Sequence, residues 1–157
     1  EGFGPFNVAF IIETLTDNKN RSASSIRTVL QKSGGRLGES GSTTHLFYNC
    51  GIIHIDKKKF SEDEVFEIAT NSGAKDCFHL ENVHEIVIEK DDFYKVKSIV
   101  EKKIDNFVYS GIEWRSLNYL ELKKEHVDTI LEIFDSLDEL DDVQNIYTNA
   151  YLEKIKL

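Results

Sequence analysis

The 157-residue sequence contains no methionine, not even at position 1, and only two cysteines. The missing methionine leads us to expect a longer natural chain, whose preceding part carries functions not represented here. Cys50 and Cys77 form no regularly spaced set. A disulfide framework is therefore excluded, and we expect a reducing, intracellular setting.

Long apolar runs are also absent. No stretch of about 18 apolar residues occurs, which argues against a membrane-spanning helix. No basic leader precedes an apolar core, so we expect no secretory signal. With 40% hydrophobic residues, the chain should fold as a soluble protein of one domain or two small ones.

Cations are scarce overall but concentrated in one segment. Nineteen lysines and arginines stand against 28 acidic residues, which gives a net charge of −9. Residues 18–38 contain no acidic residue and five cations: Lys19, Arg21, Arg27, Lys32 and Arg36. The other residues carry 14 cations and 28 acids, or −14. The overall acidity argues against a general nucleic-acid coat, whereas a local basic patch can still contact a phosphate backbone.

The basic segment has the apolar spacing of a helix over residues 20–33. Its apolar stripe consists of Ala23, Ile26, Val29 and Leu30. Asn20 or Ser22 is expected to cap the helix, and Gly34 to follow its last turn. The cations point away from the stripe, except Arg27 at its edge. This spacing does not decide between a merely solvated face and a phosphate-binding one.

Four of the nine glycines follow this helix within eight residues: Gly34, Gly35, Gly38 and Gly41. A P-loop or dinucleotide-binding turn needs a strand before its glycines and a helix after them. Here a helix precedes and the strand-like TTHLFYN follows, so nucleotide binding is disfavoured. We expect a flexible connection whose backbone can approach a partner closely.

Short alternating elements make up the rest of the sequence. Strands are expected at residues 6–16, 43–49, 51–56, 74–80, 83–89, 107–116, 117–122 and 143–150. Helices are expected at residues 20–33, 61–73, 91–105 and 123–137. The clearest helix signal is the capping box of Ser61 and Glu64, with Gly73 at the other end.

This order of elements predicts an α+β fold of two ferredoxin-like (βαββαβ) units, one inserted into the other. Residues 50–116 form the inserted domain, and residues 1–49 plus 117–157 form the discontinuous one. The core of the inserted domain is expected to include Ile53, Ile55, Val65, Ile68, Ile86, Ile88, Val96, Ile99, Val100 and Val108.

Three ordered motifs resemble the YebC/PmpR family: EGFGPFNVAFIIETLTDNKNRSAS, IRTVLQKSGGRLGESGS and LDELDDVQNIYTNA. The family includes bacterial transcriptional regulators and a mitochondrial translational activator of a cytochrome oxidase subunit. The resemblance covers its second and third domains, which implies that a basic helical N-terminal domain is missing here. It also implies control of gene expression through DNA, RNA or the ribosome, in the cytoplasm or, in a eukaryote, the mitochondrial matrix.

Neither a metal site nor an enzyme is expected. Cys77, His79 and His84, with Glu81 between them, fit no standard zinc spacing. His45 and His54 lie on separate predicted strands without a nucleophile beside them. We predict no catalysis and no cofactor.

Acidic residues gather near the C-terminal end of the last predicted helix: Asp138, Glu139, Asp141 and Asp142. They are either a solvated turn that keeps the protein soluble or a contact surface for a basic ribosomal or transcription protein. A weak Mg²⁺ site is a further reading of the same carboxylates.

The leading hypothesis is a nucleic-acid-associated regulator, acting as a DNA-binding transcriptional regulator or on the translating ribosome. Its phosphate contacts are expected at Arg21, Arg27, Lys32 and Arg36, beside the backbone of Gly34, Gly35, Gly38 and Gly41. The alternative is an acidic protein-interaction module without nucleic-acid contact. A small-molecule sensor between paired units has no support in the sequence. We expect no membrane partner and a monomer.

The chain by itself should bind duplex DNA only weakly, because it has a net charge of −9 and one basic cluster. Fluorescence anisotropy with labelled duplexes measures this affinity directly. Submicromolar binding at physiological salt would contradict the expectation.

Overall fold

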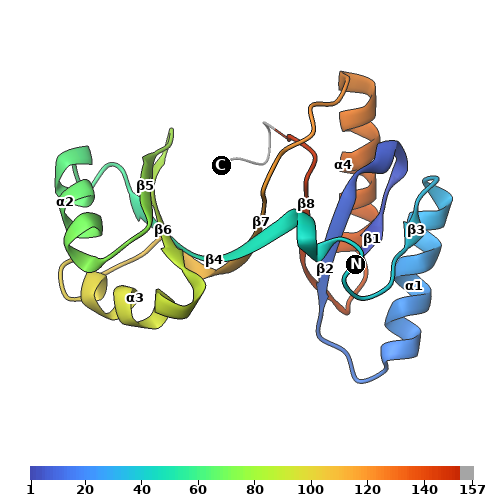
Figure 1. Ribbon diagram of the computed structural model, residues 1–157, viewed down its shortest axis with the longest axis horizontal. Helices are drawn as coiled ribbons and strands as arrows, with labels where there is room; N and C mark the ends of the chain where they lie inside the picture. Colours follow the sequence, from blue (N-terminus) through green and yellow to red (C-terminus); the bar gives the residue numbers. More distant parts are fainter. Residues whose placement is uncertain (153–157) are drawn as a thin grey trace. The chain divides into compact units, whose positions relative to one another are not determined.

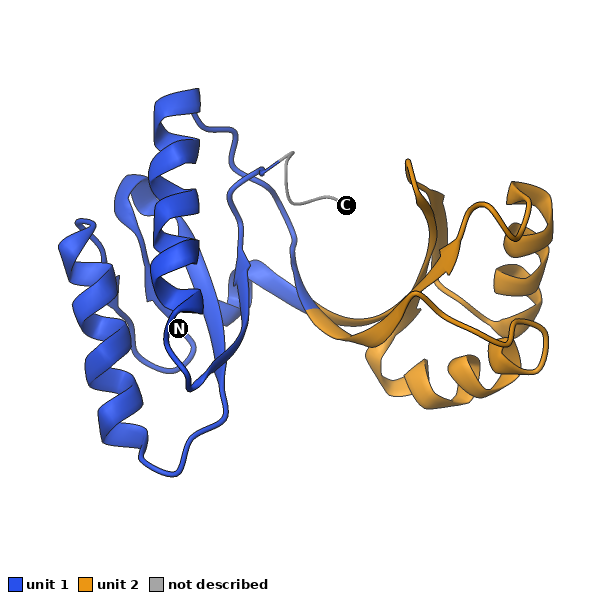
Figure 2. Cartoon of the chain, turned by 180° about the vertical axis from the view of Figure 1, so that it is seen from behind, with its two compact units in different colours: residues 1–48, 114–153 blue, residues 49–113, 154–157 orange. Residues whose placement is uncertain are grey.

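The computed structural model describes residues 1–152, which divide into two compact units (Figure 1 and Figure 2). Unit 1 comprises residues 1–48 and the described residues from 114 onward, and unit 2 comprises residues 49–113. Each unit combines a four-stranded sheet with two α-helices, which confirms the predicted α+β class.

Unit 2 has the ferredoxin-like order of elements. They are β4 (Phe47–Asp56), α2 (Glu62–Ser72), β5 (Asp76–His79), β6 (Val83–Glu89), α3 (Phe93–Glu101) and β7 (Tyr109–Ser116). The first residues of β4 and the last residues of β7 belong to unit 1. The sheet order is β5-β6-β4-β7, so the first and third strands in chain order lie side by side at the centre. Both α2 and α3 pack on one face of this sheet, over Ile53, Ile55, Ile86 and Ile88.

Helix α2 begins and ends where its local signals predict. The Glu64 amide donates to Ser61 Oγ, and the Ser61 amide donates to the Glu64 carboxylate, which completes the capping box. Gly73 ends the helix with a left-handed φ of 89°. These signals act within one turn, so the sequence alone was sufficient to place the helix.

Strand β4 differs from the prediction of two strands separated near Gly51. Residues 47–56 form one ten-residue strand, and residues 44–46 form a short 3-10 turn before it. A Cβ atom at Gly51 would lie 2.1 Å from Cδ1 of the buried Phe93. The glycine therefore admits a close packing contact and does not mark a turn.

Unit 1 is organised around β2 (Ala9–Thr14), which pairs antiparallel with β8 (Val143–Thr148). The sheet continues on the other side of β2 through β1 (Gly2–Phe3) to β3 (Arg36–Leu37), in the order β3-β1-β2-β8. The N-terminal strand thus separates β2 from β3 and pairs with both.

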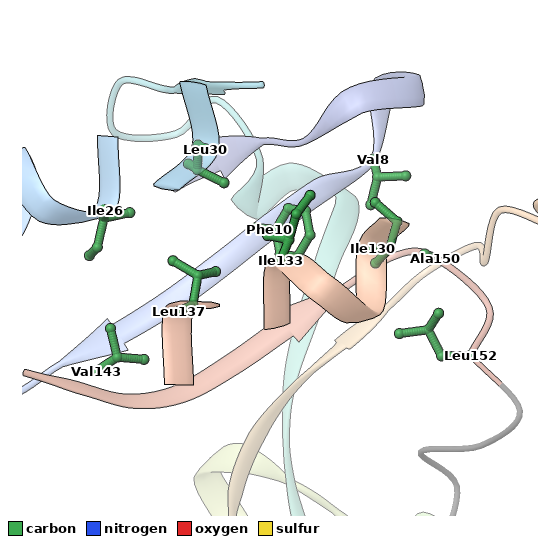
Figure 3. Packing of buried hydrophobic residues seen from close by; sticks show 10 residues of the cluster. All are labelled: Val8, Phe10, Ile26, Leu30, Ile130, Ile133, Leu137, Val143, Ala150 and Leu152. Carbon is green, nitrogen blue, oxygen red and sulfur yellow. The ribbon is translucent and has the colours of Figure 1, made fainter. Parts of the chain in front are cut away.

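Both faces of β2 are covered. On one face, α1 (Lys19–Lys32) and α4 (Lys124–Asp138) surround Phe10, as Figure 3 shows. On the other face, Ala9 and Ile11 pack with Phe47. Burial on both sides explains why this strand is a continuous apolar run instead of an alternating one.

Some predicted elements are wrong. Residues 117–122 form no strand and contribute an isolated bridge between Leu120 and Ala150, whereas β1 occupies the position beside β2. Two-residue strands such as β1 and β3 carry no periodic signal that could have predicted them. The expected helix 91–105 is a 3-10 turn, Lys90–Asp92, followed by the shorter α3.

The predicted core of unit 2 needs two corrections. Ile99 and Val108 are 36% and 60% exposed, because Phe93, Val96 and Val100 form the inward stripe of α3 and Val108 precedes β7. Ile68 is partly buried, and the other seven predicted residues are buried.

No helix within residues 1–152 combines the length and the apolar character that crossing a bilayer requires.

Replacing Gly51 with alanine should destabilise the chain by about 1–3 kcal/mol, because the new methyl group overpacks against Phe93. Urea unfolding of Gly51→Ala and the wild type measures the difference. The double variant Gly51→Ala/Phe93→Leu should lose less stability than the sum of the two single changes. If the stability losses of the two single variants simply add in the double variant, crowding against Phe93 is not the reason that position 51 requires glycine.

Candidate functional site

The basic helix α1 is set by caps at both ends. Asn18 Oδ1 accepts from the Arg21 amide at 3.0 Å, so the helix begins earlier than the predicted caps Asn20 and Ser22 imply. At the other end, the amides of Gly34 and Gly35 donate to Gln31 and Leu30, at 3.1 and 2.8 Å. Gly34 has a left-handed φ of 86°, which confirms it as the residue that follows the end of the helix.

Arg21 is engaged within unit 1. Its Nη2 lies 2.9 Å from Asp17 Oδ1 and 3.1 Å from Asp142 Oδ1, and its Nε donates to Asp142 Oδ2 at 3.3 Å. Two predicted sites of opposite charge therefore meet, because Arg21 was expected at phosphate and Asp142 at a protein partner. Both side chains are already paired with each other.

Asp142 also joins the start of β8 to the first turn of α1. The hydroxyl groups of Ser22 and Thr16 donate to its Oδ2 at 2.7 and 3.3 Å. The hydrogen bond from Ser22, together with Arg21, holds the pKa of Asp142 below its usual range. A carboxylate at this end of a helix is favoured by the helix dipole. A concavity of about 410 Å³ is lined in part by Arg21 and Asp142.

The remaining predicted cations are differently placed. Arg27 and Lys32 are exposed on α1, and the Arg36 guanidinium on β3 lies 4.7 Å above the centre of the Phe3 ring. Within residues 1–152, none of these three forms an ion pair. No carboxylate of the described residues neutralises these three cations, whereas Arg21 is already paired with Asp17 and Asp142.

The glycine loop after α1 runs against the N-terminal strand, which corrects the expectation of a free connection. A Cβ atom at Gly35 would lie 2.1 Å from the Phe3 carbonyl oxygen, and the Gly38 amide donates to the Glu1 carbonyl at 2.9 Å. Glycine at position 35 is what allows β1 to approach. Gly41 has a φ of 87° and open space around its Cα.

The Glu1 side chain holds the far end of this loop. Its carboxylate accepts from the amides of Gly41, Thr43 and Thr44, at 2.9, 2.7 and 3.2 Å, and from the Thr43 hydroxyl at 3.1 Å. Although burial raises the pKa of Glu1, the amides of Thr43, Gly41 and Thr44 outweigh it and hold the pKa at about 2. The sequence could not reveal this contact, since the donors are backbone groups some 40 residues away.

The acidic residues at the end of α4 separate into two groups. Asp138, Glu139 and Asp141 are exposed, whereas Asp142 turns toward Arg21. The last turn of α4 contains no cation that could offset the negative charges of Asp138 and Glu139. The binding roles predicted for these residues stay predictions.

The histidines of unit 2 are engaged with neighbours. His79 Nδ1 lies 2.8 Å from His84 Nδ1, and His84 Nε2 lies 2.7 Å from the Phe60 carbonyl oxygen. His54 Nε2 lies 2.8 Å from the Glu85 carboxylate. Burial raises the pKa of the nearby Cys77 thiol. Within residues 1–152, no three histidine, cysteine or acidic side chains are grouped so that they could hold a metal ion.

Comparison with known proteins gives three findings. A family model described as "TACO1/YebC second and third domain" matches residues 1–150. A protein of Pelagibacter ubique named "Probable transcriptional regulatory protein" is 47% identical over 149 residues, which cover 95% of this chain and 62% of the relative. The crystal structure of a conserved hypothetical protein from Aquifex aeolicus has a TM-score of 0.87 at 34% identity, covering 100% of this chain and 65% of that one. The chain thus spans less than two thirds of both relatives.

Replacing Glu1 with glutamine should reduce stability at neutral pH by about 1 kcal/mol, a modest value because solvent screens this partly exposed group. The pKa of Glu1 falls from 4.5 to about 2 in the folded chain, so its contribution is present above pH 4.5 and is lost as the pH falls toward 2. Melting temperatures of both chains across this range measure the effect.

The matched control is Glu39→Gln, an exposed carboxylate in the same loop. Its difference from the wild type should stay near zero at every pH. A Glu1→Gln difference that does not shrink below pH 4.5 would contradict the proposed contact.

Proposed function

We propose that this chain, which belongs to the TACO1/YebC family, is part of a nucleic-acid-associated regulator of gene expression. The family membership was predicted from three sequence motifs and is confirmed by the match over residues 1–150. The name of the Pelagibacter ubique relative, a probable transcriptional regulatory protein, supports a transcriptional role. DNA as the target is the first form of the proposal.

The observation that carries the proposal is the placement of Arg27, Lys32 and Arg36. All three lie on α1 or just after it, are exposed, and form no ion pair within the described residues, although the net charge of the chain is −9. They fall within ten residues of one another, in a segment (residues 18–38) that contains no acidic residue. Local positive charge of this kind attracts phosphate.

The same surface also fits ribosomal RNA, which presents the same phosphate chemistry. A ribosome-associated translation factor is therefore the second form of the proposal. The two forms differ in the target, so the same variants can be titrated against duplex DNA and against purified ribosomes.

A protein-docking function is favoured by a separate observation at the end of α4. Asp138 and Glu139 are exposed where the helix dipole disfavours negative charge, and Asp141 follows them in the turn. Carboxylates kept at a position that costs stability are suited to a basic partner, such as a ribosomal or transcription protein.

The test is the triple variant Arg27→Glu/Lys32→Glu/Arg36→Glu. It should bind both DNA and ribosomes more weakly, and each lost phosphate contact should flatten the salt dependence of the affinity by about 0.7–0.9 log units per log unit of salt. Stability should change by at most about 1 kcal/mol, because the side chains are exposed. Anisotropy titrations at several salt concentrations measure binding, and melting temperature controls for folding.

The matched control is Lys58→Glu/Lys59→Glu/Lys95→Glu, which changes the net charge equally through three exposed lysines of unit 2. It should keep the wild-type salt slope. Equal losses in both triple variants would show that only net charge matters, and no loss in either would favour docking through Asp138, Glu139 and Asp141.

A further inference from the structure

A second, smaller concavity lies beside the predicted cations in unit 1. Its volume is about 170 Å³, and it is bounded by the Phe3–Asn7 segment on one side and by Gly34, Gly35 and Arg36 on the other. Pockets for drug-sized metabolites measure about 300–1,000 Å³. This one is smaller and suits a single planar ring.

The Phe6–Asn7 turn is strained. Phe6 and Asn7 have φ values of 66° and 59°, and they are the non-glycine residues with positive φ in the described chain. A phenylalanine in the left-handed region is an outlier, because its Cβ crowds the backbone. Residues held this way cluster at binding sites, where the surrounding structure maintains the strain.

The strained turn holds an aromatic ring at the surface. The Phe6 ring stacks on His126 of α4, with 3.7 Å between ring centres and 13° between planes. Stacking covers one face of the ring, and Phe6 as a residue is 41% exposed. An exposed ring backed by a second ring is a rigid platform on which another planar group can stack.

The charges nearby suit a nucleotide. The C-terminal end of α1 adjoins the concavity at Gly34 and carries partial negative charge, which favours a neutral base there. Arg36 lines the concavity, and Lys32 lies two residues before Gly34, so a cation is available for the attached phosphate. A ligand that matches these features has a neutral planar ring with a phosphate beside it. A nucleotide whose base is unpaired is such a ligand.

We propose that this concavity binds one unpaired nucleobase of a single-stranded nucleic acid, which stacks on Phe6 while Arg36 contacts its phosphate. The inference rests on the proposed nucleic-acid function and adds a site to it. Stacking on aromatic side chains is how unpaired bases of RNA and single-stranded DNA are bound, because every base presents a planar face.

The experiment uses oligonucleotides of about eight nucleotides, DNA and RNA, with one 2-aminopurine as the fluorescent base. Binding to the wild-type chain should quench its emission through stacking. Phe6→Gly should abolish the quenching and weaken binding about 5- to 150-fold, the range for loss of one stacked base. Glycine accepts the left-handed conformation, so this variant should stay folded, as melting temperature will show.

Two further variants distinguish the contribution of the Phe6 ring from that of the strained turn. Asn7→Gly relaxes the neighbouring strained residue without removing the ring, so it should keep both affinity and quenching. Phe6→Trp keeps an aromatic face and should restore both. The DNA and RNA arms show which strand the site prefers.

The inference is overturned if the wild type does not quench the probe, if Phe6→Gly retains quenching, or if Asn7→Gly loses as much as Phe6→Gly. The triple charge variant at Arg27, Lys32 and Arg36 is titrated with the same oligonucleotides. If it loses binding while Phe6→Gly does not, the proposed function stands and only the stacking site fails. If the triple variant binds as the wild type does, the proposed phosphate contacts fail, including that of Arg36 beside the stacked base.

Discussion

The arrangement of unit 1 depends on the insertion of the N-terminal strand β1 between β2 and β3. Two residues make this strand, yet they pair with Phe10 and Ala9 on one side and with Leu37 and Arg36 on the other. The approach is possible only because Gly35 has no side chain to collide with the Phe3 carbonyl. At the same end of the chain, the Glu1 carboxylate binds the amides that close the glycine loop. The loop after the basic helix is thus held in one conformation by the start of the chain.

This constraint determines what the cations can do. Arg36 is held on β3 above Phe3, and β1, which pairs with β3, leads directly into the turn that contains Phe6. At the opposite end of α1, Arg21 and Asp142 neutralise each other and join the helix to β8. The basic helix therefore has two ends with different roles, since one is committed to the fold and the other faces outward.

An acidic protein that contacts nucleic acid through few cations differs from a general nucleic-acid coat. The surrounding negative charge repels phosphate everywhere except where cations are exposed and unpaired, so orientation matters more than total charge. Stacking on an aromatic platform would add affinity that salt does not screen. Experiments can separate the two contributions, because the phosphate contacts weaken as the ionic strength rises, whereas stacking is lost when the aromatic ring is removed.

The sequence by itself determined what depends on neighbouring residues: the α+β class, the capping box of Ser61 and Glu64, the position of Gly34 just after α1, and the inward stripes of α1 and α2. Such signals act within one or two turns, where spacing and backbone preference decide. Only the tertiary structure decided that Gly51 packs on Phe93, that β1 replaces residues 117–122 beside β2, and that Asp142 occupies Arg21. These contacts join residues far apart in the chain, and two of them involve backbone atoms, which are the same for every residue type. No pattern of side chains reveals those two. The third, Arg21 with Asp142, joins side chains 121 residues apart, which only the fold brings together.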